Sequence, residues 1–203
     1  MSKEYPDYSL EILKQNEGYK YIVGVDEVGL GCGFGAVVSS AVYIPQESLP
    51  ELIGKVRDSK KLSSKRREFL CDLILKTCDV GIGQVENDVI DDINIYNATK
   101  LAMKEAIRQV KYKDFILVDG NRWLDGLDTD QQPVVGGDNI SVSIACASIV
   151  AKVTRDNLIQ SLHHLFPYYG LDKNKGYLTK QHREAIKEYG ITNLHRKSFR
   201  GVE

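Results

Sequence analysis

The chain has 203 residues, of which 42% are hydrophobic and 27% charged, a composition typical of a folded domain of ordinary size. No apolar run approaches the roughly 20 residues that span a bilayer, and the N-terminal segment lacks the apolar core of a signal peptide. We therefore expect a cytoplasmic protein without membrane association. The formal net charge of −1 argues against a general nucleic-acid coat protein.

Charge is unevenly distributed along the chain. Residues 151–203 carry ten Lys or Arg against five Asp or Glu, whereas residues 1–150 carry seventeen against twenty-three. A basic C-terminal quarter suits a polyanionic partner, and an acidic remainder suits a cation site. The four cysteines and four histidines lack zinc-site spacing, so we expect free thiols and no zinc.

The first half of the chain alternates strand and helix patterns. β-branched apolar residues at 21–25 predict a buried strand that runs into Asp26 and Glu27 and then into a glycine-rich stretch. Further elements are expected as a strand at 36–44, a helix at 63–78 that begins at a serine cap, and a strand at 80–85.

The second half continues the alternation. It is expected to contain a long amphipathic helix at 93–110, a strand at 115–118, a polar loop at 122–132, a long helix at 140–165, a turn-rich link at 167–176 and a last helix at 179–189 before a basic tail. Strands that alternate with helices predict an α/β layer fold.

Carboxylates follow two of the predicted strands. Asp26 and Glu27 follow the first strand, and Asp119 follows the strand at 115–118. Open α/β sheets keep their sites at the edge where such strands end. Oxygen-only ligands favour Mg²⁺ and then Mn²⁺, and two such ions can activate water and stabilise the leaving oxygen of a phosphodiester. Asp138 precedes the long helix, where it is equally suited to be an N-cap.

Seven ordered motifs resemble those of ribonuclease HII. They are residues 24–29 (GVDEVG), 58–62 (DSKKL), 94–103 (NIYNATKLAM), 118–120 (VDG), 137–156 (GD followed by SIACASIVAKVTRD), 174–177 (NKGY) and 195–199 (HRKSF). The resemblance implies an α/β fold of the ribonuclease H type, with a mixed five-stranded sheet flanked by helices and a helical C-terminal segment. It divides the chain into a catalytic domain at 1–165 and a basic segment at 166–203 that packs on it and contributes to substrate binding.

The same resemblance implies the chemistry. The four acids Asp26, Glu27, Asp119 and Asp138 would hold two divalent ions, Mg²⁺ or Mn²⁺. The enzyme would cut the RNA strand of RNA–DNA hybrids and cut 5′ of ribonucleotides embedded in duplex DNA, leaving a 3′-hydroxyl and a 5′-phosphate. It would act as a monomer without an obligatory protein partner.

The resemblance also assigns residues to the substrate. Gly29 and Gly31 would let the backbone approach the ribose 2′-hydroxyl, and Tyr177 would lie beneath the sugar on the DNA side of a junction. The alternative for Tyr177 is a residue packed on the core. The remaining candidates are phosphate contacts that could equally be surface charges or local ion pairs, namely Lys60, Lys61, Lys152 and Arg155.

One departure affects substrate affinity. The family motif GRG reads Gly29-Leu30-Gly31 here, so Leu30 replaces an arginine and one charge-assisted phosphate contact is lost. Two alternatives stay open. A sibling ribonuclease HIII usually carries an extra N-terminal domain, whereas only about 20 residues precede the first strand here. A hybrid-binding protein that does not cut would have no need for four repelling acids.

Overall fold

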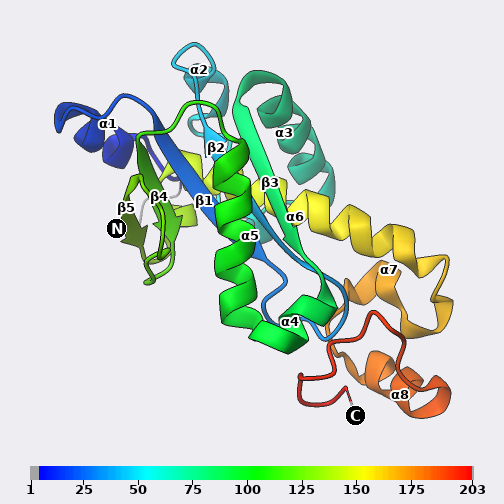
Figure 1. Cartoon of the computed structure of the whole chain (residues 1–203). Coiled ribbons are helices and arrows are strands. Elements are labelled where there is room, and N and C mark those ends of the chain that lie inside the picture. The colour runs from blue at the N-terminus through cyan, green and yellow to red at the C-terminus, as the bar shows by residue number, and fades with distance from the viewer. Residues whose placement is uncertain (1–4, 203) are drawn as a thin grey trace.

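A mixed five-stranded sheet forms the centre of the molecule in a computed structural model that describes residues 5–202 (Figure 1). Its strands are β1 (Ile22–Val28), β2 (Val37–Tyr43), β3 (Asp79–Val85), β4 (Phe115–Asp119) and β5 (Asp130–Val134). They lie in the order β3-β2-β1-β4-β5. The pairs β1–β2 and β2–β3 are antiparallel, whereas β1–β4 and β4–β5 are parallel. The five-stranded mixed sheet expected from the resemblance is therefore present.

Helices cover both faces of this sheet. Helix α5 (Ile95–Gln109) packs on the face formed by β3, β2 and β1, while α6 (Val142–His163) packs on the opposite face against β1 and β2 (Figure 1). Helix α3 (Ser64–Thr77) lies against α6. At Gly24 a Cβ would stand 2.2 Å from the backbone carbon of Ser143, so the glycine lets α6 approach β1 closely, just before the acids of β1.

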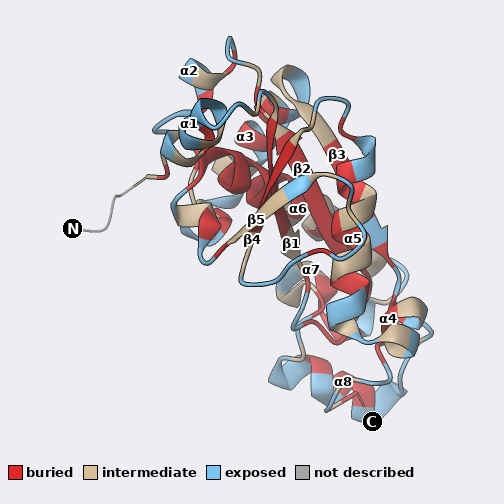
Figure 2. Ribbon diagram, turned by 60° about the vertical axis from the view of Figure 1, so that its left-hand side comes forward, coloured by how far each residue is buried: buried red, intermediate tan, exposed pale blue. Residues whose placement is uncertain are grey.

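The remaining helices are short. They are α1 (Ser9–Asn16), α2 (Leu49–Leu52), α4 (Asn87–Ile93), α7 (Leu171–Asn174) and α8 (Lys180–Tyr189), with 3₁₀ helices η1 (Ser59–Lys61), η2 (Gly137–Asn139) and η3 (Pro167–Tyr169). Buried residues concentrate in the sheet and in α6, and a smaller apolar cluster joins α8 to the end of α6 (Figure 2). No helix within 5–202 is long and apolar enough to cross a membrane.

Several predicted boundaries agree with the structure. Ser63 accepts a hydrogen bond from the backbone of Arg66 at the start of α3, and Thr179 caps α8 in the same way. The four cysteines are free, as expected. The first strand extends beyond the predicted 21–25, because Asp26 and Glu27 pair with Ser40 and Ser39 of β2 and thus lie within β1.

Other predictions were wrong. The segment at 122–132 was expected to be loop, yet residues 130–134 form β5, a polar edge strand paired with β4. Helices α1, α2 and α4 were not predicted, and α5 begins at Ile95 rather than 93, with the side chain of Asn94 as its cap. Helix α6 spans 142–163 rather than 140–165.

Candidate active site

Four carboxylate side chains line one cavity of about 230 Å³. They come from β1, from the end of β4 and from η2, and they are Asp26, Glu27, Asp119 and Asp138. The other residues that line the cavity are Val28, Ser59, Lys60, Ser148, Lys152 and Tyr177. The structure thus brings the four predicted metal ligands together with three of the residues predicted to bind substrate.

The two acids of β1 point to opposite faces of the sheet, because successive side chains of a strand alternate. Asp26 faces α6, where hydrogen bonding from Ser148 stabilises its charged form. Glu27 borders a second cavity on the α5 side, together with Thr99 and Met103. One strand therefore supplies acids to both sides of the sheet edge.

Backbone and side-chain donors position the other acids. The N–H of Gly137 donates to Oδ1 of Asp119 at 2.7 Å, which ties the end of β4 to η2. The side chain of Asn139 donates to Oδ1 of Asp138 at 2.6 Å. The helix-cap alternative for Asp138 is wrong, because Ser141 caps α6 by accepting from the N–H of Ile144 at 3.2 Å.

The electrostatics of the cavity oppose four negative charges. Burial raises the pKa of Asp26 well above its usual range, and the charges of Glu27 and Asp119 raise it further. Burial also raises the pKa of Glu27 to about 7, with a further contribution from Asp119. The pKa values of Asp119 and Asp138 are raised as well, mainly by burial, and the Lys60 ammonium partly offsets these shifts. A cation bound among the acids would relieve this repulsion.

The donor set fits a hard divalent cation. It contains carboxylate oxygens without thiolate or imidazole, the ligand class that Mg²⁺ and Mn²⁺ prefer. As placed within residues 5–202, no three Asp, Glu, His or Cys side chains stand close enough together to hold a metal ion. The carboxylates would therefore have to rotate toward a shared cation. Such a movement would be favoured because the cation neutralises the repulsion among four negative charges.

Two buried arginines hold the glycine-rich loop between β1 and β2. Arg155 of α6 donates to the carbonyls of Ala36 at 2.9 Å and of Phe34 at 3.0 Å, and to that of Lys175 at 2.8 Å. Arg196 donates to the carbonyls of Gly35 at 2.8 Å and of Gly29 at 2.7 Å. Both side chains are fully buried. The prediction of Arg155 as a phosphate contact or surface charge is therefore wrong, and the structural role of Arg196 was missed.

The two motif glycines differ in why they are glycines. Gly29 has φ of 101°, and a Cβ there would stand 2.4 Å from Nε of Arg155, so the fold itself requires this glycine. At Gly31 a Cβ would meet a single neighbour within 4 Å, a ring carbon of Tyr177 at 3.9 Å. The space above Gly31 is therefore open, and packing within the described protein does not explain this glycine.

Tyr177 is a surface residue at the edge of the acid cavity. Its side chain is 44% exposed, which excludes the core-packing alternative. The ring lies beside Gly31 and lines the same cavity as the four acids. The structure therefore leaves a large part of the aromatic side chain accessible beside the open space over the loop.

The comparisons with known proteins agree with this site. The family model described as Ribonuclease HII matches residues 23–202. The chain belongs to the ribonuclease HII family. Ribonuclease HII of Bacillus subtilis is 49% identical over 197 residues, covering 96% of this chain and 75% of that protein. Ribonuclease HII of Alkaliphilus oremlandii is 47% identical, covering 96% of this chain and 97% of that protein.

Solved structures show the same fold. Ribonuclease HII of Archaeoglobus fulgidus, solved as a complex with PCNA, superposes with a TM-score of 0.74 at 28% identity and covers 89% of this chain and 95% of its own. Ribonuclease H2 of Pyrococcus horikoshii gives 0.72 at 25% identity, covering 90% and 95%. Bst-RNase HIII in complex with Mn²⁺ gives 0.69 at 19% identity, covering 90% and 68%, a likeness of fold alone.

Membership of the ribonuclease HII family confirms the predicted family, the ribonuclease H-like fold and the class of enzyme. The chain is an endoribonuclease, a hydrolase with ribonuclease H activity on RNA–DNA hybrids. The family match selects ribonuclease HII over the sibling ribonuclease HIII, and it sets aside the alternative of a protein that binds hybrids without cutting.

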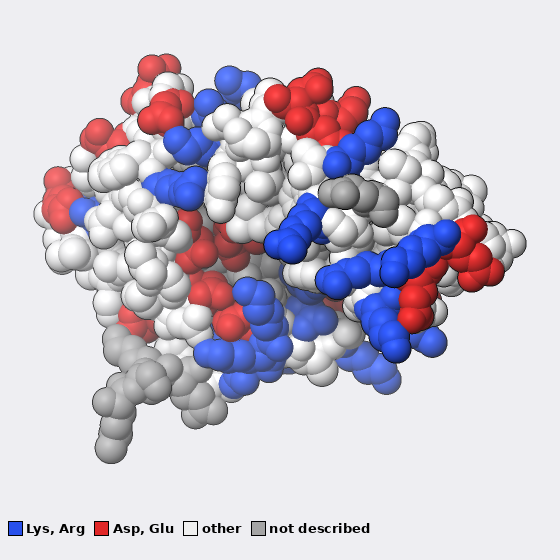
Figure 3. Space-filling model, turned by 90° about the horizontal axis from the view of Figure 1, so that it is seen from below, with Lys and Arg blue, Asp and Glu red and all other residues white. Residues whose placement is uncertain are grey.

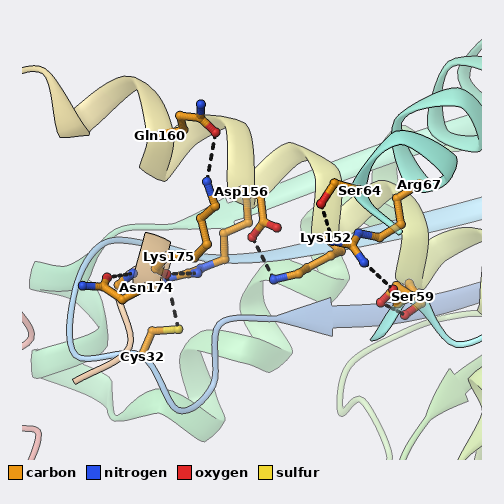
Figure 4. Close-up of polar contacts among 12 residues, drawn as sticks. Cys32, Ser59, Ser64, Arg67, Lys152, Asp156, Gln160, Asn174 and Lys175 are labelled. Atoms are coloured by element: carbon orange, nitrogen blue, oxygen red, sulfur yellow. Dashed lines mark hydrogen bonds and ion pairs between the residues drawn. The ribbon is translucent and has the colours of Figure 1, made fainter. Parts of the chain in front are cut away.

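The lysine candidates have local partners. Lys152 forms an ion pair with Asp156 at 2.8 Å on the same face of α6, which is the local ion pair given above as one alternative for this lysine (Figure 4). Lys61 donates to the side chain of Asn139. Asp58 caps η1 by accepting from the N–H of Lys60 at 2.9 Å, which places Lys60 in the acid cavity. The position of Lys60 thus depends on the turn formed by the motif residues 58–62.

A chain of hydrogen bonds through two buried histidines ends at the backbone carbonyl of Tyr177. The N–H of Thr192 donates to Nδ1 of His195 at 2.9 Å, so the proton of neutral His195 resides on Nε2. That Nε2 lies 3.1 Å from Nε2 of His182, whose Nδ1 lies 3.1 Å from the carbonyl of Tyr177. Donation therefore runs from the C-terminal tail through both rings to the backbone of Tyr177. Sequence spacing gave no sign of this contact.

This pair makes stability fall in acid. Burial lowers the pKa of His182, and burial together with the facing His182 ring lowers that of His195 to about 4. An unfolded His titrates near 6.5, so between about 6.5 and 4 the unfolded chain binds more protons and stability declines as the pH falls. We expect the advantage in unfolding free energy of the parent over His195→Asn, which does not titrate, to shrink by about 1 to 2 kcal/mol from pH 7 to pH 5. Urea denaturation at both pH values measures this difference, and a constant difference would contradict the prediction.

Proposed function

We propose that this ribonuclease uses two divalent ions, Mg²⁺ or Mn²⁺, to hydrolyse the RNA strand of RNA–DNA hybrids and to cut 5′ of ribonucleotides embedded in duplex DNA, leaving a 3′-hydroxyl and a 5′-phosphate. The observation that carries the proposal is the single cavity lined by Asp26, Glu27, Asp119 and Asp138. These four carboxylates would hold the ions. When bound, such ions activate the attacking water and stabilise the leaving 3′ oxygen.

The residues around the acids support recognition of a ribose. The open space over Gly31 admits a sugar edge, and the loop carbonyls and amides there are held rigid by Arg155 and Arg196. Tyr177 presents a ring face on which a deoxyribose would pack, while an added 2′-hydroxyl would be crowded. Lys60 and Lys152 place positive charge at the same cavity for the phosphates of the strand.

The C-terminal segment supports the same reading. We propose residues 1–165 as the catalytic domain and 166–203 as a segment that packs on it and contributes Tyr177 to substrate binding. Phe34 and Ile159 of the first part share an apolar cluster with Tyr169, Leu171 and Ile186 of the second.

We also propose a cytoplasmic monomer without an obligatory protein partner. The PCNA complex is a property of the Archaeoglobus relative.

A cleavage assay on three matched duplexes tests the proposal. The substrates are an RNA–DNA hybrid, a DNA duplex with one ribonucleotide and the same duplex in DNA alone, each with Mg²⁺, Mn²⁺ or EDTA. We expect cutting of the first two with either metal, none with EDTA, and product ends that mark incision on the 5′ side of the ribonucleotide. Cutting in EDTA, or cutting of the all-DNA duplex, would contradict it.

Gly31→Ala should impair cleavage without impairing the fold. The added methyl meets a Tyr177 ring carbon at 3.9 Å, an ordinary contact, so the melting temperature should stay within a few degrees of the parent. The methyl would occupy the space proposed for the ribose edge, and we expect a loss of about tenfold or more in the cleavage rate. Parental cleavage by a variant of parental stability would show that the substrate does not approach Gly31.

Tyr177→Ala should distinguish the two substrates. If the ring packs on a deoxyribose, its loss should slow cleavage at a single embedded ribonucleotide more than cleavage within a long RNA tract, because the tract offers no such sugar. Tyr177→Phe should retain the preference. Tyr168→Ala removes another tyrosine of the C-terminal segment, 60% exposed, and serves as the control. Equal losses on both substrates would argue against the assignment.

A further inference from the structure

A second cavity of about 260 Å³ adjoins the four acids on the α5 side of the sheet. It shares Glu27 and Asp119 with the acid cavity, and Leu30 of the glycine-rich loop also lines it. It is also lined by Tyr96, Thr99 and Lys100 of α5 and by Asn121, Arg122 and Leu124 of the loop after β4. A strand bound across the acids would therefore pass over or beside this cavity.

Arg122 carries an unpaired charge at this cavity. Its guanidinium carbon lies 4.1 Å from the centre of the Tyr96 ring, and both side chains are exposed. None of the ion pairs found within residues 5–202 includes Arg122. The nearby carboxylate of Asp125 is instead bound to Lys100 at 2.7 Å. The N–H groups of the guanidinium are thus not engaged in an ion pair with a carboxylate of the described residues, while the contact with the ring restricts the position of the group.

The loop that carries Arg122 is anchored on both sides. Leu124 is buried, and its N–H and carbonyl bond to the side-chain amide of Gln131 in β5 at 2.8 and 2.9 Å. The Lys100–Asp125 pair ties the same loop to α5, and Lys104 adds a bond to the Asp125 carbonyl at 3.3 Å. Arg122 therefore projects from a braced turn, which lowers the entropy lost when it binds a ligand.

The charges around the cavity define the ligand. The acids of the cavity repel an anion, whereas Arg122 lines it with a planar donor array that matches a phosphate. Leu30, which also lines the cavity, stands at the motif position where the family motif has an arginine, so this position carries no positive charge. Asp and Glu side chains gather in a hollow of the surface, with Lys and Arg side chains around it (Figure 3).

We propose that Arg122, held against Tyr96, binds a backbone phosphate of the nucleic acid beside the one that is cut. This inference rests on the proposed function, because it assumes that the substrate strand crosses the four acids. Arg122 then supplies the cation that Leu30 lacks, from a different loop on the same cavity. An exposed aromatic face beside the guanidinium would also shield the contact from water.

Hybrid binding across a salt series tests the site, with Ca²⁺ in place of Mg²⁺ to suppress cleavage. Arg122→Gln should weaken binding of a short RNA–DNA hybrid about fivefold at ~0.1 M salt and lower the log–log salt slope by about 0.7 to 0.9, the value for one phosphate contact. Arg122→Lys should keep the slope and lose part of the affinity, because the charge remains while the fork is lost. The matched control is Arg108→Gln. Arg108 is an exposed arginine of α5 that lies about 18 Å along the helix from Tyr96.

The outcomes separate this site from the proposed function. Parental affinity and slope in Arg122→Gln, or an equal loss in Arg108→Gln, would overturn the phosphate site. Cleavage of the hybrid by the parent in Mg²⁺ is measured in parallel, so failure of the proposed function appears there and not in the binding comparison. Because Arg122 is exposed, the variant should melt with the parent, and its loss of affinity would then report the contact itself.

Discussion

Asp119→Asn should abolish most hybrid cleavage while leaving the protein folded. The amide is isosteric and its oxygen can still accept the N–H of Gly137, so the link between β4 and η2 survives. The lost charge removes one candidate ligand for the ions, and we expect the single-turnover rate in Mg²⁺ to fall roughly a thousandfold, about 4 kcal/mol of transition-state stabilisation. Without metal, thermal stability should be equal or higher, because one of four repelling charges is gone.

The control for this variant is Asp128→Asn, the same chemical change at an exposed aspartate of the loop that follows β4. It should cleave as the parent does. Near-parental cleavage by Asp119→Asn would remove this residue from the catalytic machinery. A large drop in the melting temperature would instead show that the charge of Asp119 serves the fold.

Arg155→Gln should destabilise the protein by about 3 to 5 kcal/mol. The guanidinium satisfies three backbone carbonyls in a buried place, and a shorter amide leaves at least one of them without a donor. The loop at 29–36 should also become mobile, so cleavage per folded molecule should fall. Urea denaturation and single-turnover cleavage measure the two effects. Arg108→Gln, at the surface, should change neither by a comparable amount.

The elements that could be predicted from the sequence are those with strong local signals. Ser63 precedes a periodic apolar pattern and caps α3 as expected, and α8 begins directly after Thr179, where the last helix was expected to start. The buried strand that carries Asp26 and Glu27 is short and β-branched, and the acids at its end were correctly expected to lie near Asp119. Strand propensity and short-range capping depend on neighbouring residues, which is why these predictions agree with the structure.

Elements stabilised by distant contacts could not be predicted. Strand β5 is polar and contains Pro133, and it exists because β4 offers a parallel edge to pair with. Helix α1 has little apolar character at its ends, and its buried Glu11 accepts hydrogen bonds from the hydroxyls of Ser141 and Ser143, about 130 residues away. In both cases the stabilising partner lies outside any local window. The fifth strand was expected from the resemblance alone.

The same limit applies within the site. Asp138 precedes a helix at about the right place for a cap, yet Ser141 takes that role and leaves the aspartate at the cavity. Arg155 was expected as a phosphate contact, a surface charge or part of a local ion pair, and Arg196 was assigned no role, but both are buried under the loop. An arginine that serves backbone carbonyls has no acidic partner in the sequence to reveal it.

The two arginines that hold the glycine-rich loop are synthesised after the loop itself and after the four acids. The four acids belong to segments that precede residue 139, whereas Arg196 binds the Gly35 carbonyl 161 residues along the chain from it. Domains assemble as they emerge, from the N-terminus onward. A growing chain can thus contain all four acids while its glycine-rich loop still lacks one of its two arginines. A chain cut before residue 196 would therefore keep the four acids and Arg155 but would leave the carbonyls of Gly29 and Gly35 without their buried donor.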